Sequence, residues 1–552
     1  MPTAVESTSL KSPPQDPILG SHRWLIILIP ATLVLATYLW LCVYAYPATD
    51  DWFQASGGRD HGVWTSVASY WHGTGGRWFM ALLVFSLGLF PDLSAAYPLL
   101  VLANIVALVG AGTLIVKCWG INGAKALILA TMLLAALQFT CLPMLDVGNI
   151  GPHTATPETI YWLSGSWPYA GAYPLLAVAA WLILGSVPGW FRWCGCIVIG
   201  LLVSGLSEMA AVAGVMVGAT LGGCGRRHGW VLAAASAVGF GISMASPGNL
   251  NRLAMLRQEV QSGAGISKLP AAMLNSLQFT AIHLVDWLTQ PALIAAGLLV
   301  FSHSSRQPTS LTVRPRWCLF AGIGTIVGVW AMAIPTLALV GFLEARHEGL
   351  VGLFAVAGLL STAALVGRAW PLLLSASVSV PLVAIWFSIA IATRLYWPSP
   401  ISPLGRWSDI LAAACLLILL IAWMRRDQRI LVALSAVTLL WQPSWWQAIA
   451  DATGKAPTLD RKVHARDHVV KALVDTGQTQ IVIPWLGAQE IQPRTIRIYE
   501  VQPGWMADGY AAYFRISRLI ISERVETPRP ARLSPTAPAA EAPAAPMTIP
   551  AP

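Results

Sequence analysis

Charged side chains are scarce in this chain of 552 residues: only 11% are Asp, Glu, Lys or Arg, whereas 56% are hydrophobic. The mean hydropathy of +0.63 and the apolar runs along most of the chain argue against a soluble multidomain protein. The sequence therefore predicts an all-α polytopic membrane protein with about twelve or thirteen transmembrane helices and a small C-terminal α/β cap.

Cysteine pairs with the spacing of a metal site are also missing. The eight cysteines lie inside or at the ends of apolar segments, and none forms a CxxC motif. We therefore expect buried apolar side chains rather than disulfides or zinc ligands. Nucleic acid is not an expected partner either, because the Lys and Arg residues behind the net charge of +9 are spread in small groups between apolar runs.

These basic groups indicate which side of the membrane each loop occupies, since loops rich in Lys and Arg usually face the cytoplasm. The alternating segments, rich in aromatic residues, Pro, Gly and acids, are then extracytoplasmic. They are 46–76, 144–171, 246–275, 341–349, 396–407 and the chain after about residue 441. Two regions leave the number of crossings open: 77–116 holds one or two, and 194–223 reads as two short helices that meet at a break.

Four parts are expected along the chain. They are a cytoplasmic tail (1–23), a transmembrane domain (24–441), an extracytoplasmic α/β region (442–526) and a disordered Pro/Ala-rich tail (527–552). Within the α/β region, the pattern predicts a helix over 459–474 and strands over 479–484 and 495–501.

The acidic pair Asp50 and Asp51 stands just past the first apolar run, Trp24 to Ala45. That run is longer than the apolar part of a signal peptide and more spans follow it, so we interpret it as a retained first span. Two adjacent like charges raise one pKa and carry an electrostatic cost. We therefore expect at least one of the two to act as an acid, a base or a metal ligand.

The second extracytoplasmic segment offers aromatic faces that suit a sugar ring, close to several hydroxyl groups. An aromatic belt at the membrane interface explains these residues equally well. The residues concerned are Tyr161, Trp162, Trp167 and Tyr169, with Glu158 just before them.

Three further charged residues are candidates for a site. Glu208 lies in the break of 194–223, where it either faces a polar cavity or stabilises a helix N-terminus. Arg252 follows a turn over 246–251, and Arg346 lies in a very short extracytoplasmic loop. Each arginine is placed to bind a lipid phosphate, although a simple headgroup anchor accounts for either.

In their order and sidedness, these motifs resemble the polytopic GT-C glycosyltransferase superfamily. The resemblance covers about 24–346, with a fainter echo at 505–513, and is closest to a bacterial branch associated with cell-envelope glycans. The motifs are the acidic pair, a Gly-Arg-Trp entry at Arg77, Tyr-Trp-Leu-Ser-Gly-Ser from Tyr161, Ser-Gly-Leu-Ser-Glu ending at Glu208, and Ser-Pro-Gly-Asn-x-x-Arg with Asn249 and Arg252.

The resemblance implies an inverting transfer from a polyprenyl-phosphate-linked sugar to a glycan, lipid or protein acceptor, at the outer face of a bacterial inner membrane. Asp50 or Asp51 would be the base, with a slight preference for Asp50 because it lies nearer the span, and Arg346, or secondly Arg252, would neutralise the phosphate. The implied substrate-binding residues are Arg77, Glu158, Tyr161, Trp162, Trp167, Tyr169, Glu208 and Asn249.

No cofactor is implied with certainty. Glu158 and Glu208, together with the aspartates, are an alternative set of ligands for a divalent cation such as Mg²⁺ or Mn²⁺. Three other functions remain open at this point: a transporter or flippase of lipid-linked sugars, a glycan ligase or polymerase, and an assembly scaffold without catalysis.

Overall fold

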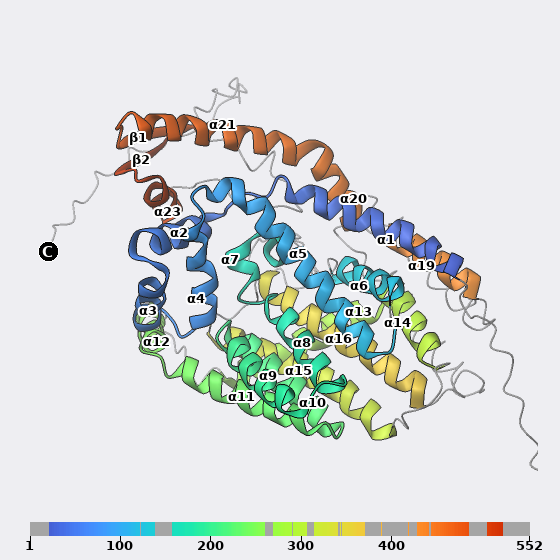
Figure 1. The fold of residues 1–552 in the computed structure, drawn as a ribbon. Coiled ribbons are helices and arrows are strands. Elements are labelled where there is room, and N and C mark those ends of the chain that lie inside the picture. The colour runs from blue at the N-terminus through green and yellow to red at the C-terminus, as the bar shows by residue number, and fades with distance from the viewer. Residues whose placement is uncertain are drawn as a thin grey trace, which may run out of the picture.

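The computed structural model describes residues 21–121, 123–137, 157–259, 269–289, 291–305, 314–339, 343, 345–369, 388, 414, 418, 428–440, 443–484 and 505–522. This part of the chain is predominantly helical, with one pair of short strands (Figure 1).

The elements of the first half run from α1 to α12. They are α1 (Ser21–Cys42), α2 (Thr49–His61), α3 (Val63–Gly73), α4 (Trp78–Phe85), η1 (Ser86–Leu89), α5 (Leu93–Cys118), α6 (Ala124–Leu137), η2 (Pro157–Tyr161), α7 (Leu163–Ser166), α8 (Ala172–Leu184), α9 (Gly189–Ser204), α10 (Glu208–Gly223), α11 (Arg227–Met244) and α12 (Pro247–Glu259).

The elements of the second half end in the two strands. They are α13 (Leu269–Thr289), α14 (Pro291–Ser304), α15 (Pro315–Leu339), α16 (Ala345–Ala369), α19 (Gln428–Leu440), α20 (Pro443–Ala450), η5 (Asp451–Lys455), α21 (Ala456–Asp475), β1 (Gln480–Pro484), α23 (Trp505–Phe514) and β2 (Arg518–Ser522).

Three helices of the described part are long and apolar enough to cross a membrane: 93–118, 315–338 and 346–369. The helical class is thus confirmed there, but the number of such helices falls short of the predicted twelve or so. One physical reason is that breaks shorten the apolar helices. The predicted spans around 171–187 and 194–204 form α8 and α9, which have only 13 and 16 residues, whereas a span needs about 20. Two of the apolar runs counted among the predicted spans, 371–391 and 410–423, lie almost wholly outside the described residues.

The first predicted extracytoplasmic segment contains two helices. α2 begins at Thr49, so the acidic pair lies in its first turn, where negative charge is favoured by the helix dipole. α3 follows α2 directly, and its Trp64 side chain is 74% exposed. Only one element of the 77–116 region, α5, has the length of a span.

The predicted break in 194–223 is confirmed. α9 ends at Ser204 and α10 begins at Glu208, and the hydroxyl of Ser207 caps α10 by accepting a hydrogen bond from the Ala210 amide. Two other predictions are wrong in detail. The turn expected at 246–251 forms the first turns of α12, and Arg346 lies in the first turn of α16 rather than in a loop.

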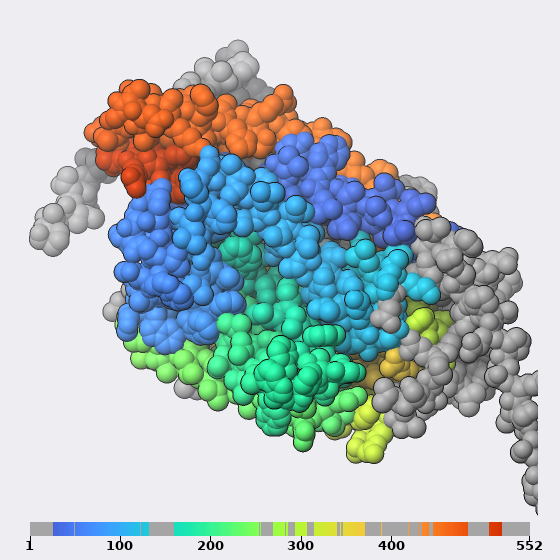
Figure 2. Space-filling view, in the orientation of Figure 1, coloured from blue at the N-terminus to red at the C-terminus, as the bar shows by residue number. Residues whose placement is uncertain are grey.

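The N-terminal helix and the C-terminal elements lie along the same side of the molecule, where α1 runs beside α19 (Figure 1). In Figure 2 the orange and red C-terminal elements cover the blue region that contains α2. The predicted helix and first strand appear as α21 and β1. The strand expected at 495–501 lies outside the described residues, and β1 pairs in parallel with the unpredicted β2.

Buried aromatic and polar contacts join this C-terminal part to α2. The Trp52 side chain is 2% exposed and packs between four rings: Tyr46, Tyr510, Tyr513 and Phe514. Behind them, the hydroxyls of Tyr46 and Tyr510 both donate hydrogen bonds to the buried carboxylate of Asp467 on α21. The C-terminal elements therefore support the helix that carries the acidic pair.

Candidate active site

A polar cavity of about 210 Å³ lies where several helix ends converge. Six of the residues proposed from the sequence line it: Asp50, Arg77, Tyr169, Glu208, Arg252 and Arg346. The first and last of these six lie more than 250 residues apart in sequence. The other described residues of the lining are Gln54, Tyr70, Met80, Ser164, Pro168, Pro335, Thr336 and His347.

Helix ends place the charged groups of this cavity. Asp50 lies in the first turn of α2 and Glu208 is the first residue of α10, positions where the helix dipole stabilises a carboxylate. Arg346 lies at the start of α16, where the dipole disfavours a cation. Cation–π contacts offset this unfavourable interaction with the dipole. The Cζ atom of Arg346 lies 5.1 Å from the Trp162 ring centre and 6.0 Å from that of Tyr169.

Arg77 and Glu208 form an ion pair at the cavity wall. Nη2 of Arg77 lies 2.6 Å from Oε2 of Glu208, and Nε lies 3.0 Å from the same oxygen. The Glu208 side chain is only 7% exposed and that of Arg77 15%. Of the two alternatives for Glu208, both hold: it begins a helix and it faces a polar cavity.

A close backbone approach brings Arg77 to this position. A side chain at Gly76 would place its Cβ 1.9 Å from the carbonyl oxygen of Ser243, at the end of α11. Only glycine therefore fits here, and the Gly-Arg-Trp motif has a steric reason for its first residue.

Asp51 is fully buried behind the cavity. Its Oδ1 atom accepts hydrogen bonds from the amide and hydroxyl of Ser164, and its Oδ2 atom accepts from the Tyr97 hydroxyl and the Ala48 amide. Burial raises the pKa of the Asp51 carboxyl to about 6, and these hydrogen bonds oppose the rise. One raised pKa in the pair was expected, and burial of the carboxyl is its largest cause.

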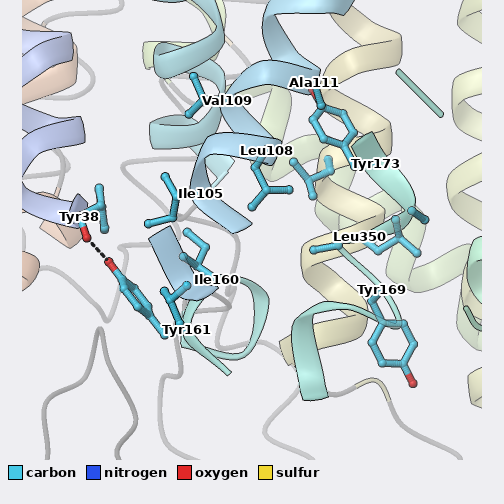
Figure 3. Close-up of a cluster of buried hydrophobic side chains, with 14 of the residues drawn as sticks. Tyr38, Ile105, Leu108, Val109, Ala111, Ile160, Tyr161, Tyr169, Tyr173 and Leu350 are labelled. Carbon is cyan, nitrogen blue, oxygen red and sulfur yellow. Dashed lines mark hydrogen bonds between the residues drawn. The ribbon is translucent and has the colours of Figure 1, made fainter. Parts of the chain in front are cut away.

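The remaining sequence candidates lie elsewhere. Tyr161 is a core residue whose hydroxyl donates a 2.9 Å hydrogen bond to the Tyr38 carbonyl, and Figure 3 shows it turned away from Tyr169. Trp167 packs against the hydrophobic core. Asn249 is buried, and its side-chain amide donates to the Ser243 carbonyl. The prediction that these three bind substrate is thus not supported by the geometry, and the Glu158 side chain lies outside the described part.

Several cavity residues were not selected from the sequence. The His347 side chain is buried, and its Nε2 atom lies 3.0 Å from the Tyr169 hydroxyl. Gln54 follows Asp50 by one helical turn of α2, and Ser164 belongs to the Tyr-Trp-Leu-Ser-Gly-Ser motif. The spacing of four residues in a helix could have indicated Gln54, because such residues share a face.

The described carboxylates do not fit a shared divalent cation. Both oxygens of Glu208 accept hydrogen bonds from Arg77, and those of Asp51 are saturated by four donors. Within the described residues, no three His, Cys, Asp or Glu side chains gather as metal ligands would. Apart from the Arg77–Glu208 ion pair, the charged groups of this lining are the Asp50 carboxylate and the guanidinium groups of Arg252 and Arg346.

No known protein family, curated protein or solved structure matches this chain.

Proposed function

We propose that this chain is a multi-pass membrane glycosyltransferase that moves a sugar from a polyprenyl-phosphate-linked donor to a glycan, lipid or protein acceptor on the extracytoplasmic side. One observation carries the proposal: Asp50 shares the lining of a single cavity with Arg252 and Arg346. Such a transfer requires a base for the acceptor and cations for the leaving phosphate.

In the proposed reaction, the Asp50 carboxylate takes the proton from an acceptor hydroxyl. The oxygen then forms a bond to the anomeric carbon while the bond from that carbon to the phosphate oxygen breaks. Polyprenyl phosphate leaves with the electron pair, and the configuration at the anomeric carbon inverts. Arg346 and Arg252 stabilise the charge that develops on the phosphate.

The neighbouring groups have supporting roles in this scheme. Because Glu208 neutralises Arg77, this pair adds hydrogen-bonding groups to the cavity but little net charge. The ring of Tyr169, held by His347, offers a face to the sugar. Asp51 keeps the start of α2 in place through Ser164 and Tyr97, so Asp50 is the base.

Apolar side chains on the outer surface support a membrane location. Ile29, Leu99 and Val238 are 63%, 67% and 59% exposed, on three different helices. Exposed apolar surface of this kind is costly in water and favourable in lipid. Shorter helices such as α9 and α10 would then enter the membrane as a broken pair.

Donor binding tests the role of the arginines. The purified full chain is titrated with polyprenyl phosphate, and Arg346→Gln is compared with Arg461→Gln, an exposed arginine on α21. Loss of a charge-assisted contact should weaken binding about tenfold or more in Arg346→Gln alone. Equal binding by both variants would contradict the assignment.

Glycan analysis of the cell envelope separates the other candidate functions. Cells that lack the protein should lose one sugar residue from an envelope glycan. Loss of an entire polymer would favour a ligase or polymerase. Lipid-linked sugars that accumulate on the cytoplasmic side, with the transfer reaction itself intact in open membranes, would favour a flippase.

A further inference from the structure

A second cavity, of about 270 Å³, lies between the helices and is largely apolar. Its volume is close to the lower end of small-molecule sites, about 300 Å³. It shares no described lining residue with the polar cavity. Its walls come from α8, α10, α15, α16 and the end of α5, and Tyr173, labelled in Figure 3, is one of the lining residues.

This cavity is elongated along α16. The residues of α16 that line it run from Leu350 to Arg368, a rise of about 27 Å at 1.5 Å per residue. That distance approaches the hydrocarbon thickness of a bilayer, about 30 Å. Leu350 lies one helical turn after Arg346, so the end of the cavity at Leu350 is near the polar cavity. The end at Arg368 is far from it.

All charge in the described lining gathers at the far end. Arg226 and Arg368 are the charged residues of this set, and both are partly exposed. Trp119, at the end of α5, holds this region together: its ring nitrogen donates to the Ser361 hydroxyl, and its carbonyl accepts a 2.6 Å hydrogen bond from Arg368.

The hydroxyl groups along the walls do not make the cavity polar. Thr325 and Ser361 both donate to carbonyl groups of their own helices. The occupant must therefore present an apolar chain to most of the cavity and an anion to its basic end. A phospholipid with an anionic headgroup has this chemistry, and basic pockets between helices are known to bind such headgroups.

We propose that this cavity binds one anionic phospholipid, with its headgroup at Arg226 and Arg368 and an acyl chain between α8, α10, α15 and α16. The site is separate from the donor site and does not depend on the proposed transferase activity. Because the cavity lies beside α16, whose first turn contains Arg346, a bound lipid would also stabilise the helix that carries this arginine.

Native mass spectrometry of the full chain tests this proposal with phosphatidylglycerol and phosphatidylcholine of identical acyl chains. The wild type should retain one phosphatidylglycerol and prefer it about tenfold or more, as expected for charge-assisted contacts. Arg226→Gln should lose this preference. The matched control is Arg227→Gln, an exposed neighbour that does not line the cavity, and it should keep the preference.

A cavity-filling variant tests the position of the acyl chain. Ala357→Phe places a ring inside the apolar part of the lining without changing any charge, so it should reduce the retention of both lipids. Equal retention of the two lipids by the wild type would overturn the proposal. So would phosphatidylglycerol retention that neither Arg226→Gln nor Ala357→Phe reduces.

Discussion

The hydroxyl of Tyr97 donates a 2.6 Å hydrogen bond to Oδ2 of Asp51. This bond joins the first turn of α2 to α5, the longest apolar helix of the described part. It holds Asp51 inside the protein, whereas its neighbour Asp50 lines the polar cavity. Two adjacent acids thus lie in different surroundings because consecutive residues of a helix point in different directions.

Asp51 should make the stability of the protein depend on pH. Its pKa is about 6 in the folded chain and about 3.9 in an unfolded one, so the folded state binds the proton more tightly. The stabilisation is complete below about pH 4 and is lost as the pH rises through about 6. The change amounts to about 3 kcal/mol, measured by denaturant unfolding in detergent at several pH values.

Asp51→Asn provides the control for this pH dependence. The variant should be less stable than the wild type at low pH. Its side-chain NH₂ group would face N–H and O–H donors and could not accept hydrogen bonds from them. It should lack the fall in stability between about pH 4 and 6. A fall of the same size in the variant would show that another group titrates there.

Removal of one partner from the Arg77–Glu208 pair should be strongly destabilising. Glu208→Gln leaves a nearly buried guanidinium without a counter-ion, at a cost of about 3–5 kcal/mol in unfolding free energy. The exposed pair Arg59 and Asp60 is the comparison, and Asp60→Asn should cost about 1 kcal/mol or less. Similar losses in both variants would mean that burial adds nothing to the first pair.

Gly76→Ala should unfold at a lower temperature than the wild type, because its Cβ would collide with the carbonyl oxygen of Ser243. Gly73→Ala is a matched change three residues earlier, at the end of α3, where nothing lies within 4 Å of the added carbon. That control should be neutral or slightly stabilising. Equal melting temperatures of the two variants would contradict the close approach of α11.

The contact between the C-terminal elements and α2 should be visible in a pair of tryptophan variants. Trp52→Ala removes a ring that four aromatic side chains surround and should cost about 3–5 kcal/mol. Trp64→Ala, at a position that is 74% exposed, should change the unfolding free energy by about 0.5 kcal/mol or less. Limited proteolysis should also cleave the C-terminal part faster in Trp52→Ala only.

Much of the cavity was predictable because its residues belong to local motifs. Glu208 was a candidate because an acid at a break between short helices is costly unless it faces a polar cavity or a helix N-terminus, whereas Arg77 was a candidate only through the Gly-Arg-Trp motif of the resemblance. The break was predicted from the basic groups on both sides of 194–223 and from its polar centre. The structure adds that Ser207 caps α10 and that Glu208 lies in its first turn.

The roles of Asp50 and Asp51 could not be separated from the sequence. Consecutive residues of a helix point about 100° apart, and the rotation of α2 depends on Tyr97 and Ser164, which lie far away in the chain. The preference for Asp50 rested on its nearness to the first span. The structure places Asp50 on the cavity for a different reason, the direction of its side chain on α2.

Non-local packing explains the other failures. The parallel pairing of β1 with β2 depends on a contact between segments about 40 residues apart, and no local pattern specifies it. Tyr161 and Trp167 have the composition of a sugar-binding loop but serve the core. Aromatic residues alone do not reveal whether a ring faces a cavity or a neighbouring helix.

The most direct test of the central claim is the rate of sugar transfer in membranes that contain the Asp50→Asn variant. Labelled polyprenyl-phosphate sugars supply the donor, and Asp60→Asn, on the same helix but outside the cavity, is the control. Loss of a general base should slow transfer about 10²- to 10⁴-fold in Asp50→Asn, with Asp60→Asn unchanged. Full transfer by Asp50→Asn would contradict the assignment of Asp50 as the base.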